Sequence, residues 1–328
     1  MKEIVVTGYR TTGKLHLGNL LGNILNMIDL QEKYKCFYFF ANLHALTTGY
    51  KDTSEIMNDV KIQLAEFLAL GINPAKTVLY LQSDIPEITE LTLYFSMFTP
   101  ISRMQRNPTY KEQIEELSNK DLRMMGFLAY PILMASDIII VHADYVPVGD
   151  DQIPHIEITR EIARKFNRLY SDYFKEPQAL VTKASRVPGI DGRKMSKSYG
   201  NAIYLSDEPD VIKKKVRMMI TDPERVYVTD KGHPKICDVF YLHKSFSKEE
   251  INEIEKKCKN AQIGCTQCKD ELAKKISNYL SDFRKKRAYY LNNPDYLRKV
   301  LKNGKKIVRE IARETIKQVR HRMKLNMF

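Results

Sequence analysis

Two lysines on a glycine-flanked stretch are placed to hold a polyphosphate. Residues 191–200 read DGRKMSKSYG, so Lys194 and Lys197 lie three residues apart between glycines. Lysines on a mobile loop can close on a polyphosphate and hold its charge as that charge shifts. An isolated K-x-x-K pattern more often belongs to a solvated basic loop, so the phosphate interpretation needs a second supporting segment.

A second segment of this kind lies near the N-terminus. Residues 12–19 read TGKLHLGN, after a β-branched run at 3–7 that predicts a buried strand and before a helix expected over about 18–32. A strand, a glycine-bearing loop and a helix together present backbone N–H groups and the positive end of a helix dipole to a phosphate. His16 is then placed to meet the reacting α-phosphate, although an isolated histidine there would more often be a surface or capping residue.

Further apolar runs predict the sheet that must position these segments. Residues 36–41 and 77–82 read as strands that alternate with helices. This rhythm predicts an α/β fold with a Rossmann-like, doubly wound parallel sheet, whose ligands bind at the carboxyl ends of the strands. His44 follows one such end. Gly149, Asp150, Asp151 and Gln152 follow another, where carboxylates can take a ribose diol or an α-ammonium group.

One carboxylate stands alone in an apolar stretch. Residues 127–141 read FLAYPILMASDIIIV, and a buried Asp137 is costly without a partner. It could cap a helix or accept backbone N–H groups, or it could accept one hydrogen bond from a substrate in an apolar pocket. Tyr130, Met134 and Asp137 are four and three residues apart, so they can share one helical face. An aromatic amino acid with a single N–H or O–H donor would suit that surface.

The charge is distributed unevenly along the chain. Residues 1–206 contain 23 Lys+Arg and 23 Asp+Glu, whereas residues 207–328 contain 30 and 17 and supply the whole net charge of +13. A basic second half suggests contact with a polyanion, although a solvated helical surface explains it equally well. We expect a catalytic domain over 1–205, with a helical insertion at about 86–125, and an α-helical domain over 206–328. The last helix could pack back on the catalytic domain.

Four cysteines in the basic half have a spacing typical of a metal centre. Cys237, Cys258, Cys265 and Cys268 form C-x20-C-x6-C-x2-C, while Cys36 lies apart in a predicted strand. The sequence has no apolar run long enough to span a membrane and no signal peptide, so we expect a cytoplasmic protein, in which disulfides are rare. Four thiolates suit zinc or a [4Fe–4S] cluster.

The two phosphate-binding segments resemble the HIGH and KMSKS motifs of class I aminoacyl-tRNA synthetases. Along nearly its whole length the sequence resembles the bacterial tryptophanyl-tRNA synthetases. The matching stretches are TGKLHLGNLLG, HALT, YPILMASDI, VPVGDDQ followed by HIE, TREIA and FN, and GRKMSKSYGN. The resemblance implies activation of tryptophan by Mg²⁺-ATP, transfer to tRNA-Trp, and a homodimer whose contact lies in the helical insertion.

The resemblance also implies roles for individual residues. His16, Asn19, Lys194 and Lys197 are expected to act on the reacting phosphates. The expected ATP site consists of Arg10, Thr11, Thr12, Gly18, Asn19, Gly149, Asp150, Asp151, Val187, Lys194, Met195, Ser196, Lys197 and Ser198. Thr11 stands where the family usually has proline, and Asp150 where it commonly has glutamate.

The expected tryptophan pocket contains Asp137, matched to the acceptor of the indole N–H, together with Tyr130, Met134, His44 and Gln152. The cysteines resemble those of a subgroup that binds a [4Fe–4S] cluster in the anticodon-binding domain, with the first gap two residues shorter than the subgroup's C-x22-C. This favours the cluster over zinc.

Two other interpretations remain open at this point. A tyrosyl-tRNA synthetase shares the fold, the KMSKS loop and a pocket aspartate, but the VGDDQ stretch and the cysteine spacing weigh against it. A synthetase-like RNA-binding protein without catalytic activity is the second alternative. The intact HLGN and KMSKS segments weigh against that one.

Overall fold

The structure, a computed structural model, describes residues 2–11, 13–116, 122–181 and 186–326. By contacts the chain forms two compact units. The first unit comprises residues 1–13, 27–183 and 293–328, and the second comprises residues 14–26 and 184–292. Each unit is described by itself.

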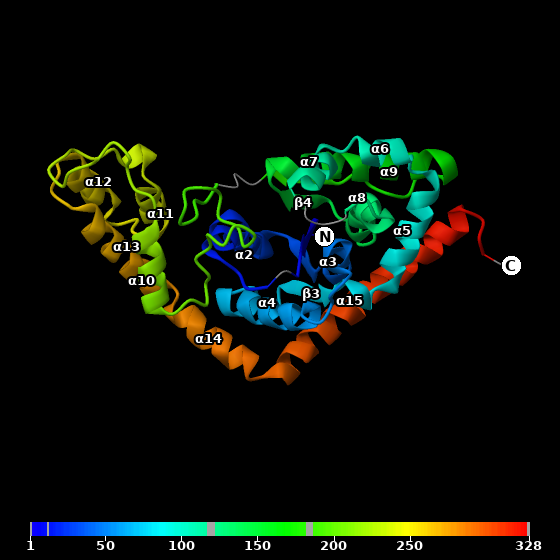
Figure 1. Cartoon of the computed structure of the whole chain (residues 1–328). Helices are drawn as coiled ribbons and strands as arrows, with labels where there is room; N and C mark the ends of the chain where they lie inside the picture. Colours follow the sequence, from blue (N-terminus) through cyan, green and yellow to red (C-terminus); the bar gives the residue numbers. More distant parts are fainter. Residues whose placement is uncertain (1, 12, 117–121, 182–185, 327–328) are drawn as a thin grey trace. The chain divides into compact units, whose positions relative to one another are not determined.

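A five-stranded parallel sheet forms the centre of the first unit, in the order β3-β2-β1-β4-β5 (Figure 1). The strands are β1 (Ile4–Tyr9), β2 (Lys35–Phe40), β3 (Thr77–Leu81), β4 (Tyr145–Val148) and β5 (Gln178–Val181). The middle strands are apolar runs that are buried on both faces, as parallel strands covered by helices require. The order reverses at β1, between β2 and β4, and this is where a doubly wound sheet binds its ligands.

Helices connect and cover these strands. They are α2 (Leu25–Lys33, its first two residues in the second unit), α3 (Asn42–Gly49), α4 (Ile56–Leu70), α5 (Pro86–Phe98), α6 (Ile101–Gln105), α7 (Pro108–Glu116), α8 (Met125–Ile139), α9 (Ile153–Tyr170) and α15 (Pro294–Arg322). Two short turns, η2 (Gln82–Asp84) and η3 (Asp150–Gln152), follow β3 and β4 directly. The predicted α/β class and parallel sheet are therefore confirmed, and α5, α6 and α7 occupy the predicted helical insertion.

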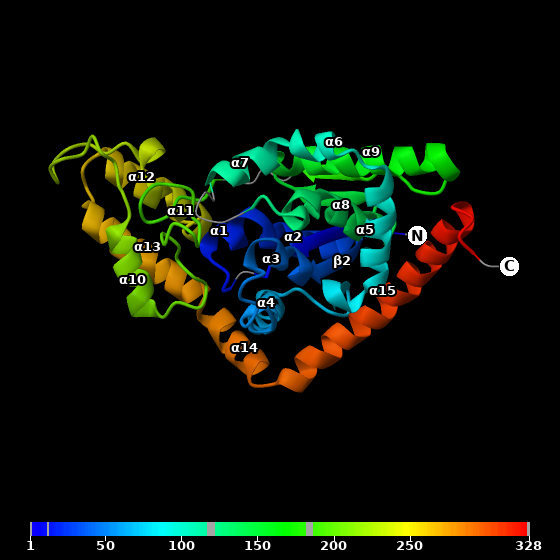
Figure 2. The same cartoon turned by 45° about the vertical axis from the view of Figure 1, so that its right-hand side comes forward.

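The last helix belongs to the first unit. Its buried positions recur every three or four residues, which makes one apolar stripe along 29 residues. The stripe packs on the edge strand β3 and along α5, as Figures 1 and 2 show. Gly304 marks the closest approach, because a Cβ there would lie 1.9 Å from the carbonyl oxygen of Leu79.

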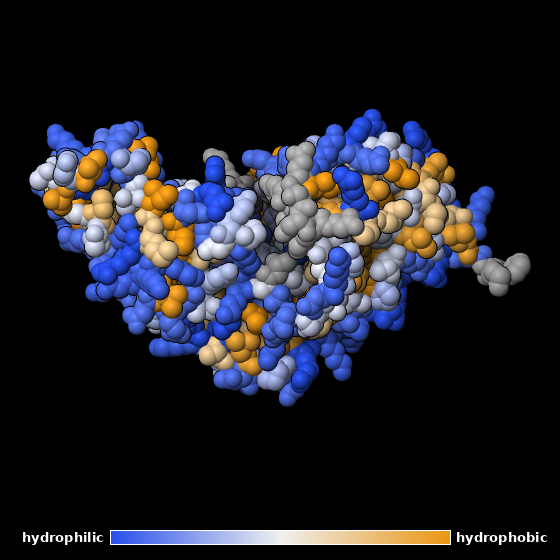
Figure 3. All heavy atoms as spheres, viewed as in Figure 1, coloured by the Kyte–Doolittle hydropathy of each residue, from blue (hydrophilic) through white to orange (hydrophobic). Residues whose placement is uncertain are grey.

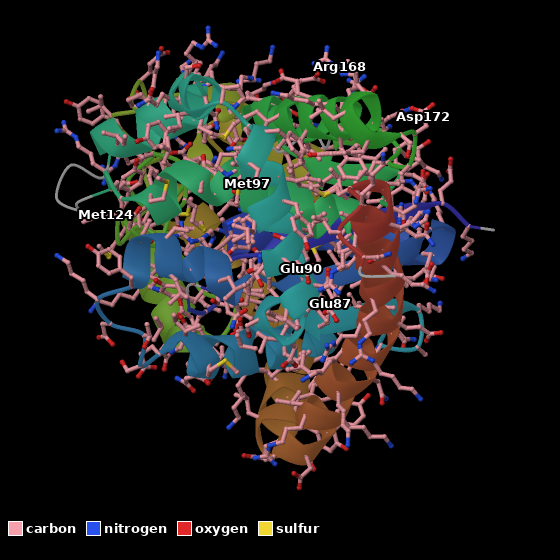
Figure 4. The ribbon with its side chains drawn as sticks, turned by 90° about the vertical axis from the view of Figure 1, so that its right-hand side faces the viewer. Glu87, Glu90, Met97, Met124, Arg168 and Asp172 are labelled. Carbon is pink, nitrogen blue, oxygen red and sulfur yellow. The ribbon has the colours of Figure 1, made fainter. Side chains whose placement is uncertain are left out.

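Ion pairs also join α15 to α5. Arg309 and Glu87 are 2.9 Å apart, and Arg320 makes two bonds to Glu90 at 2.7 and 2.8 Å. Figure 4 labels both glutamates on α5 beside α15. The units therefore divide the chain differently from the expected boundary at 205/206. The last helix belongs to the first unit because its apolar stripe is buried there, and residues 14–26 and 184–205 belong to the second unit.

The second unit is built mostly from helices. Its N-terminal piece holds α1 (Leu17–Asn19) and a π-helical turn η1 (Leu20–Ile24). The rest contains α10 (Pro209–Met218), η4 (Pro234–Ile236), α11 (Asp238–Phe246), α12 (Ile251–Lys259), α13 (Cys265–Tyr279) and α14 (Ser281–Leu291). Among the described residues of both units, no helix is both long and apolar enough to cross a membrane.

Candidate active site

Two segments far apart in the sequence lie against each other in the second unit. Leu17 donates its backbone N–H to the Ile203 carbonyl at 3.0 Å. The next amide, that of Gly18, points at the sulfur of Met195 at 3.4 Å. Met195 is the buried methionine of KMSKS. The HLGN and KMSKS segments are therefore in direct contact.

His16 begins α1 and is held in a reciprocal cap. Its Nδ1 accepts the backbone N–H of Asn19 at 3.3 Å, and the Asn19 side-chain oxygen accepts the His16 N–H at 3.1 Å. Burial, together with the nearby charge of Lys197, lowers the pKa of His16 to about 4. At neutral pH His16 is therefore an uncharged imidazole whose Nδ1 is occupied as an acceptor, which leaves the proton on Nε2 as a donor.

The loop that carries Lys194 and Lys197 is anchored by Asn201. This side chain is 1% exposed, accepts the Ser196 N–H at 2.8 Å, and donates to Asp191 at 2.7 Å and to the Lys194 carbonyl at 3.1 Å. Gly192 turns the loop with φ of +78°, a region that favours glycine. The backbone of the loop is thus fixed at its base, where Lys194 is exposed and Lys197 is partly buried.

Asp137 lies on α8 and is fully buried in the first unit. Its Oδ2 is 3.0 Å from Nε2 of His44, and the amide of Gln82 donates to Oδ1 and Oδ2 at 2.9 and 2.8 Å. Burial raises the pKa of Asp137, and the hydrogen bonds from His44 and Gln82 act in the opposite direction. The structure therefore brings together Asp137 and His44, two of the predicted pocket residues.

Tyr130 joins a second buried network on the same helix. Its hydroxyl lies 2.8 Å from Nε2 of His155, which is also 3.1 Å from the side-chain nitrogen of Asn107. Burial raises the pKa of Tyr130 and lowers that of His155 to about 4. Arg10 is partly buried here, and its guanidinium donates to the hydroxyl of Thr48. Burial lowers the pKa of Arg10, while the neighbouring Tyr130 acts in the opposite direction.

Polar residues follow β4 as the sequence predicts. Gly149 precedes η3, and Asp150 and Asp151 form its first turn. The amide of Gln152 donates to Asp151 at 2.8 Å, and the Asp151 carbonyl accepts the Thr109 hydroxyl at 3.3 Å. The carboxylates thus lie at the carboxyl end of a strand, where such groups can hold a ribose or an ammonium group.

The four cysteines of the basic half line one small cavity of about 20 Å³ in the second unit, beside Asp222 and Arg225. Each is partly buried and none is in a disulfide. Burial, together with the other three thiols, raises the pKa of Cys268 to about 12. The Cys268 sulfur also lies 3.4 Å from Nε2 of His243.

The remaining predicted residues have simpler surroundings. Met134 packs against the hydrophobic core, and Val187 is buried, with its carbonyl accepting the N–H of Met195 at 2.8 Å. The hydroxyl of Ser198 lies 2.9 Å from that of Ser196. Thr11 is 3% exposed, and its hydroxyl has no hydrogen-bond partner among the described residues. Thr12 lies outside the described residues.

Sequence reasoning missed three buried polar residues of these networks: Gln82, His155 and Asn201. Gln82 could have been found, since it is the last residue of the predicted strand 77–82, at the carboxyl end where ligands bind. His155 and Asn201 gave no comparable signal, because a polar residue in a helix or loop is usually exposed.

A model of the family described as "tRNA synthetases class I (W and Y)" matches residues 2–281. The tryptophan–tRNA ligase of Thermotoga maritima is 45% identical over 324 residues, which cover 98% of this chain and 99% of the relative. That of Aquifex aeolicus is 39% identical and covers 98% and 99%.

The solved structures give the same picture. The tryptophanyl-tRNA synthetase of Campylobacter jejuni, solved in complex with ADP and tryptophan, superposes with a TM-score of 0.90 at 34% identity and covers 98% of this chain and 99% of its own. A tyrosyl-tRNA synthetase from Archaeoglobus fulgidus has a TM-score of 0.68 at 22% identity, covers 87% and 90%, and shares the fold alone.

Proposed function

The chain belongs to the class I tryptophanyl-tRNA synthetases, and from this premise we propose which of its residues perform the reaction. The enzyme joins tryptophan to tRNA-Trp in two steps, with tryptophanyl-adenylate between them. In the first step the tryptophan carboxylate attacks the α-phosphate of ATP and diphosphate leaves. No protein nucleophile is required, so positioning and stabilisation of charge supply the catalysis.

The observation that best supports a working phosphate site is the contact between the HLGN and KMSKS segments. The backbone amide of Gly18 contacts the side-chain sulfur of Met195, and the positive charge of Lys197 contributes to lowering the pKa of His16. In the proposed mechanism His16 donates Nε2–H to an ATP phosphate, and Lys194 and Lys197 hold the charge that develops on the leaving diphosphate. ATP enters with Mg²⁺ held chiefly by its own phosphates.

Substrate specificity is proposed to rest on Asp137. Its carboxylate would accept the indole N–H of tryptophan, and Tyr130, Met134, His44 and Gln152 would complete the pocket. A buried acceptor rejects a side chain that lacks the donor, because the acceptor is then left unpaired. Phenylalanine has no ring N–H, so the enzyme should discriminate against it more strongly than its smaller size alone would predict.

Amino-acid-dependent ATP–diphosphate exchange tests this assignment. We expect exchange with tryptophan alone among the twenty amino acids. Lys194→Ala and Lys197→Ala should each lower kcat on the order of 10²–10³-fold, whereas Lys214→Ala, an exposed lysine of the same unit, should not. Exchange with tyrosine would reassign the substrate, and full exchange in both loop variants would remove the lysines from the mechanism.

We further propose that Cys237, Cys258, Cys265 and Cys268 hold a [4Fe–4S] cluster. The four thiols share one cavity. Four thiolates on zinc, at about 2.3 Å each, place the sulfurs within roughly 4 Å of one another. Among the described residues, only Asp222, Glu224 and His233 bring three possible ligand atoms within 4.8 Å. The C-x20-C-x6-C-x2-C spacing, which resembles that of the [4Fe–4S] subgroup, supports a cluster over zinc.

Metal analysis of anaerobically purified protein distinguishes the two. Four irons and four sulfides per chain are expected, with both lost in Cys265→Ser and retained in Cys36→Ser. One zinc per chain would show that the four cysteines bind zinc instead of a [4Fe–4S] cluster. If a folded sample contains neither iron nor zinc, the four cysteines do not form a metal site. The helices around the cavity are proposed as the anticodon-binding part, in keeping with the net charge of +5 on residues 207–292.

A homodimer through α5 and α6 is the remaining proposal. Leu93, Met97 and Ile101 are 54, 70 and 60% exposed there, and Met125 at the start of α8 is 72% exposed. Figure 3 shows hydrophobic side chains over this part of the first unit, and Figure 4 looks onto α5 and labels Met97. A two-fold interface uses the same patch on both copies, so one apolar face is sufficient.

The oligomeric state in solution tests the dimer. Sedimentation of the unaltered chain should give a dimer, and Met97→Glu should shift it to monomer because a carboxylate would be buried without a partner. Met57→Glu is the matched control, since Met57 is also an exposed methionine of the first unit, at 53%. A monomer in the unaltered chain, or a dimer insensitive to Met97→Glu, would contradict the proposed interface.

A further inference from the structure

Gln82 has no assigned role, yet it touches the proposed specificity residue more closely than any predicted pocket residue does. It is fully buried at the carboxyl end of β3. Its side-chain nitrogen lies 2.9 Å from Oδ1 and 2.8 Å from Oδ2 of Asp137. A single amide thus bridges both oxygens of the carboxylate.

The orientation of this amide is determined by its other end. The Gln82 oxygen accepts the backbone N–H of Leu43 at 3.1 Å and that of His44 at 3.3 Å. These are first-turn amides of α3, whose own N-cap supplies no side-chain acceptor. Only an oxygen can accept them, so the nitrogen must face Asp137.

The hydrogen bonds leave the two carboxylate oxygens unequal. Oδ2 accepts from both Gln82 and His44, whereas Oδ1 accepts from Gln82 alone among the residues that the structure describes. Oδ1 therefore keeps acceptor capacity for one more donor. Burial already raises the pKa of Asp137, with His44 and then Gln82 acting against it, so loss of the Gln82 donor would shift the group further toward the protonated acid.

We infer that Gln82 is a positioning residue that holds Asp137 as an oriented acceptor and thereby sets how strictly the enzyme requires an N–H on the substrate ring. This inference rests on the proposed role of Asp137. It extends that role by assigning Oδ1 as the atom that meets the indole N–H and Gln82 as the residue that holds Oδ1 in place.

The test compares tryptophan with its benzothiophene isostere, in which sulfur replaces the indole N–H. Exchange kinetics with both substrates give a ratio of kcat/KM that is independent of the folded fraction of each sample. Gln82→Met should lower kcat/KM for tryptophan on the order of 10–100-fold, chiefly through KM, as expected for a lost hydrogen bond to a charged group. The isostere should change less than about 3-fold by the same reasoning, so the ratio should fall.

Gln31→Met is the matched control. Gln31 is also a buried glutamine and bonds backbone groups of Gly71 and Asn73, before the other end of β3. It should leave the ratio unchanged, because its loss affects stability and not the acceptor.

Asp137→Ala separates the two proposals. If it leaves the ratio unchanged, Asp137 is not the N–H acceptor and the proposed function of that residue fails. If it abolishes the preference while Gln82→Met retains it, Asp137 keeps its role and the inference about Gln82 is overturned. If the ratio of kcat/KM for tryptophan to that for the isostere falls in both Gln82→Met and Asp137→Ala, the inference is supported.

Discussion

At the scale of the residue, His16 takes its chemistry from its surroundings. A solvated histidine has a pKa near 6.5 and would be partly cationic at physiological pH. Burial and the positive charge of Lys197 lower the pKa of His16 to about 4. The imidazole is neutral above that pH, so it can help a phosphate only by donating Nε2–H and not as a cation.

The ratio of adenylate-formation rates between the unaltered enzyme and His16→Gln tests this state. Glutamine can still donate a hydrogen bond but does not titrate, so we expect a constant ratio from pH 8 to pH 6. His16→Ala should be slower on the order of 10²–10³-fold, as for the loss of one transition-state donor. If the ratio rises as pH falls through 6.5, His16 acts as a cation.

The residue types of the site could be predicted better than its hydrogen bonds. Lys194, Lys197 and Asp137 stand out in the sequence because of their spacing or their apolar neighbours. Gln82 and Asn201 do not stand out in this way. Gln82 bonds Asp137, which is 55 residues away, and Asn201 bonds residues at least 5 positions away, so only the fold brings these partners near. A buried amide has no sequence periodicity of its own.

At the scale of the element, α15 shows how far a helical pattern can be interpreted. Its apolar stripe predicts an amphipathic helix but not the surface it covers. That surface is the edge strand β3, whose unpaired backbone groups a helix can shield. The parallel sheet itself was predictable, because each of its buried strands is an apolar run followed by a helix.

Gly304→Ala tests the contact between α15 and β3. Alanine is the better helix former by about 1 kcal/mol, yet its Cβ would lie 1.9 Å from the Leu79 carbonyl oxygen. The backbone must shift, so we expect the free energy of unfolding to fall by about 1–3 kcal/mol. Denaturant unfolding measures it. In Gly126→Ala, at an exposed helical glycine with nothing within 4 Å, stability should stay equal or rise.

At the scale of the whole molecule, the positive charge has two uses. Residues 293–328 carry 11 Lys+Arg and 3 Asp+Glu, so they hold +8 of the net +13. Part of this charge is paired within the first unit, where Lys305, Arg309 and Arg320 reach Asp84, Glu87 and Glu90. A basic C-terminal half therefore indicates more than contact with RNA, and charge counting along the sequence could not separate the two uses.

A chain that ends at Asn292 tests whether the last helix is an integral part of the first unit. It would keep every proposed catalytic and tryptophan-binding residue. It would lose Val308, Ala312, Ile316 and Val319, which complete the hydrophobic core around α5, and would leave β3 as an uncovered edge. We therefore expect aggregation or a collapsed, poorly packed state, with no cooperative unfolding of the first unit and no tryptophan-dependent exchange.

The matched control is a chain that ends at Leu325, which keeps the whole of α15. It should retain the unfolding midpoint and the exchange activity of the full chain, because only the last three residues are removed. Circular dichroism melts and exchange assays on both truncated chains give the comparison. A chain ending at Asn292 that unfolds cooperatively and activates tryptophan would show that the sheet is stable without its last helix, and would contradict the assignment of this helix as an integral part of the first unit.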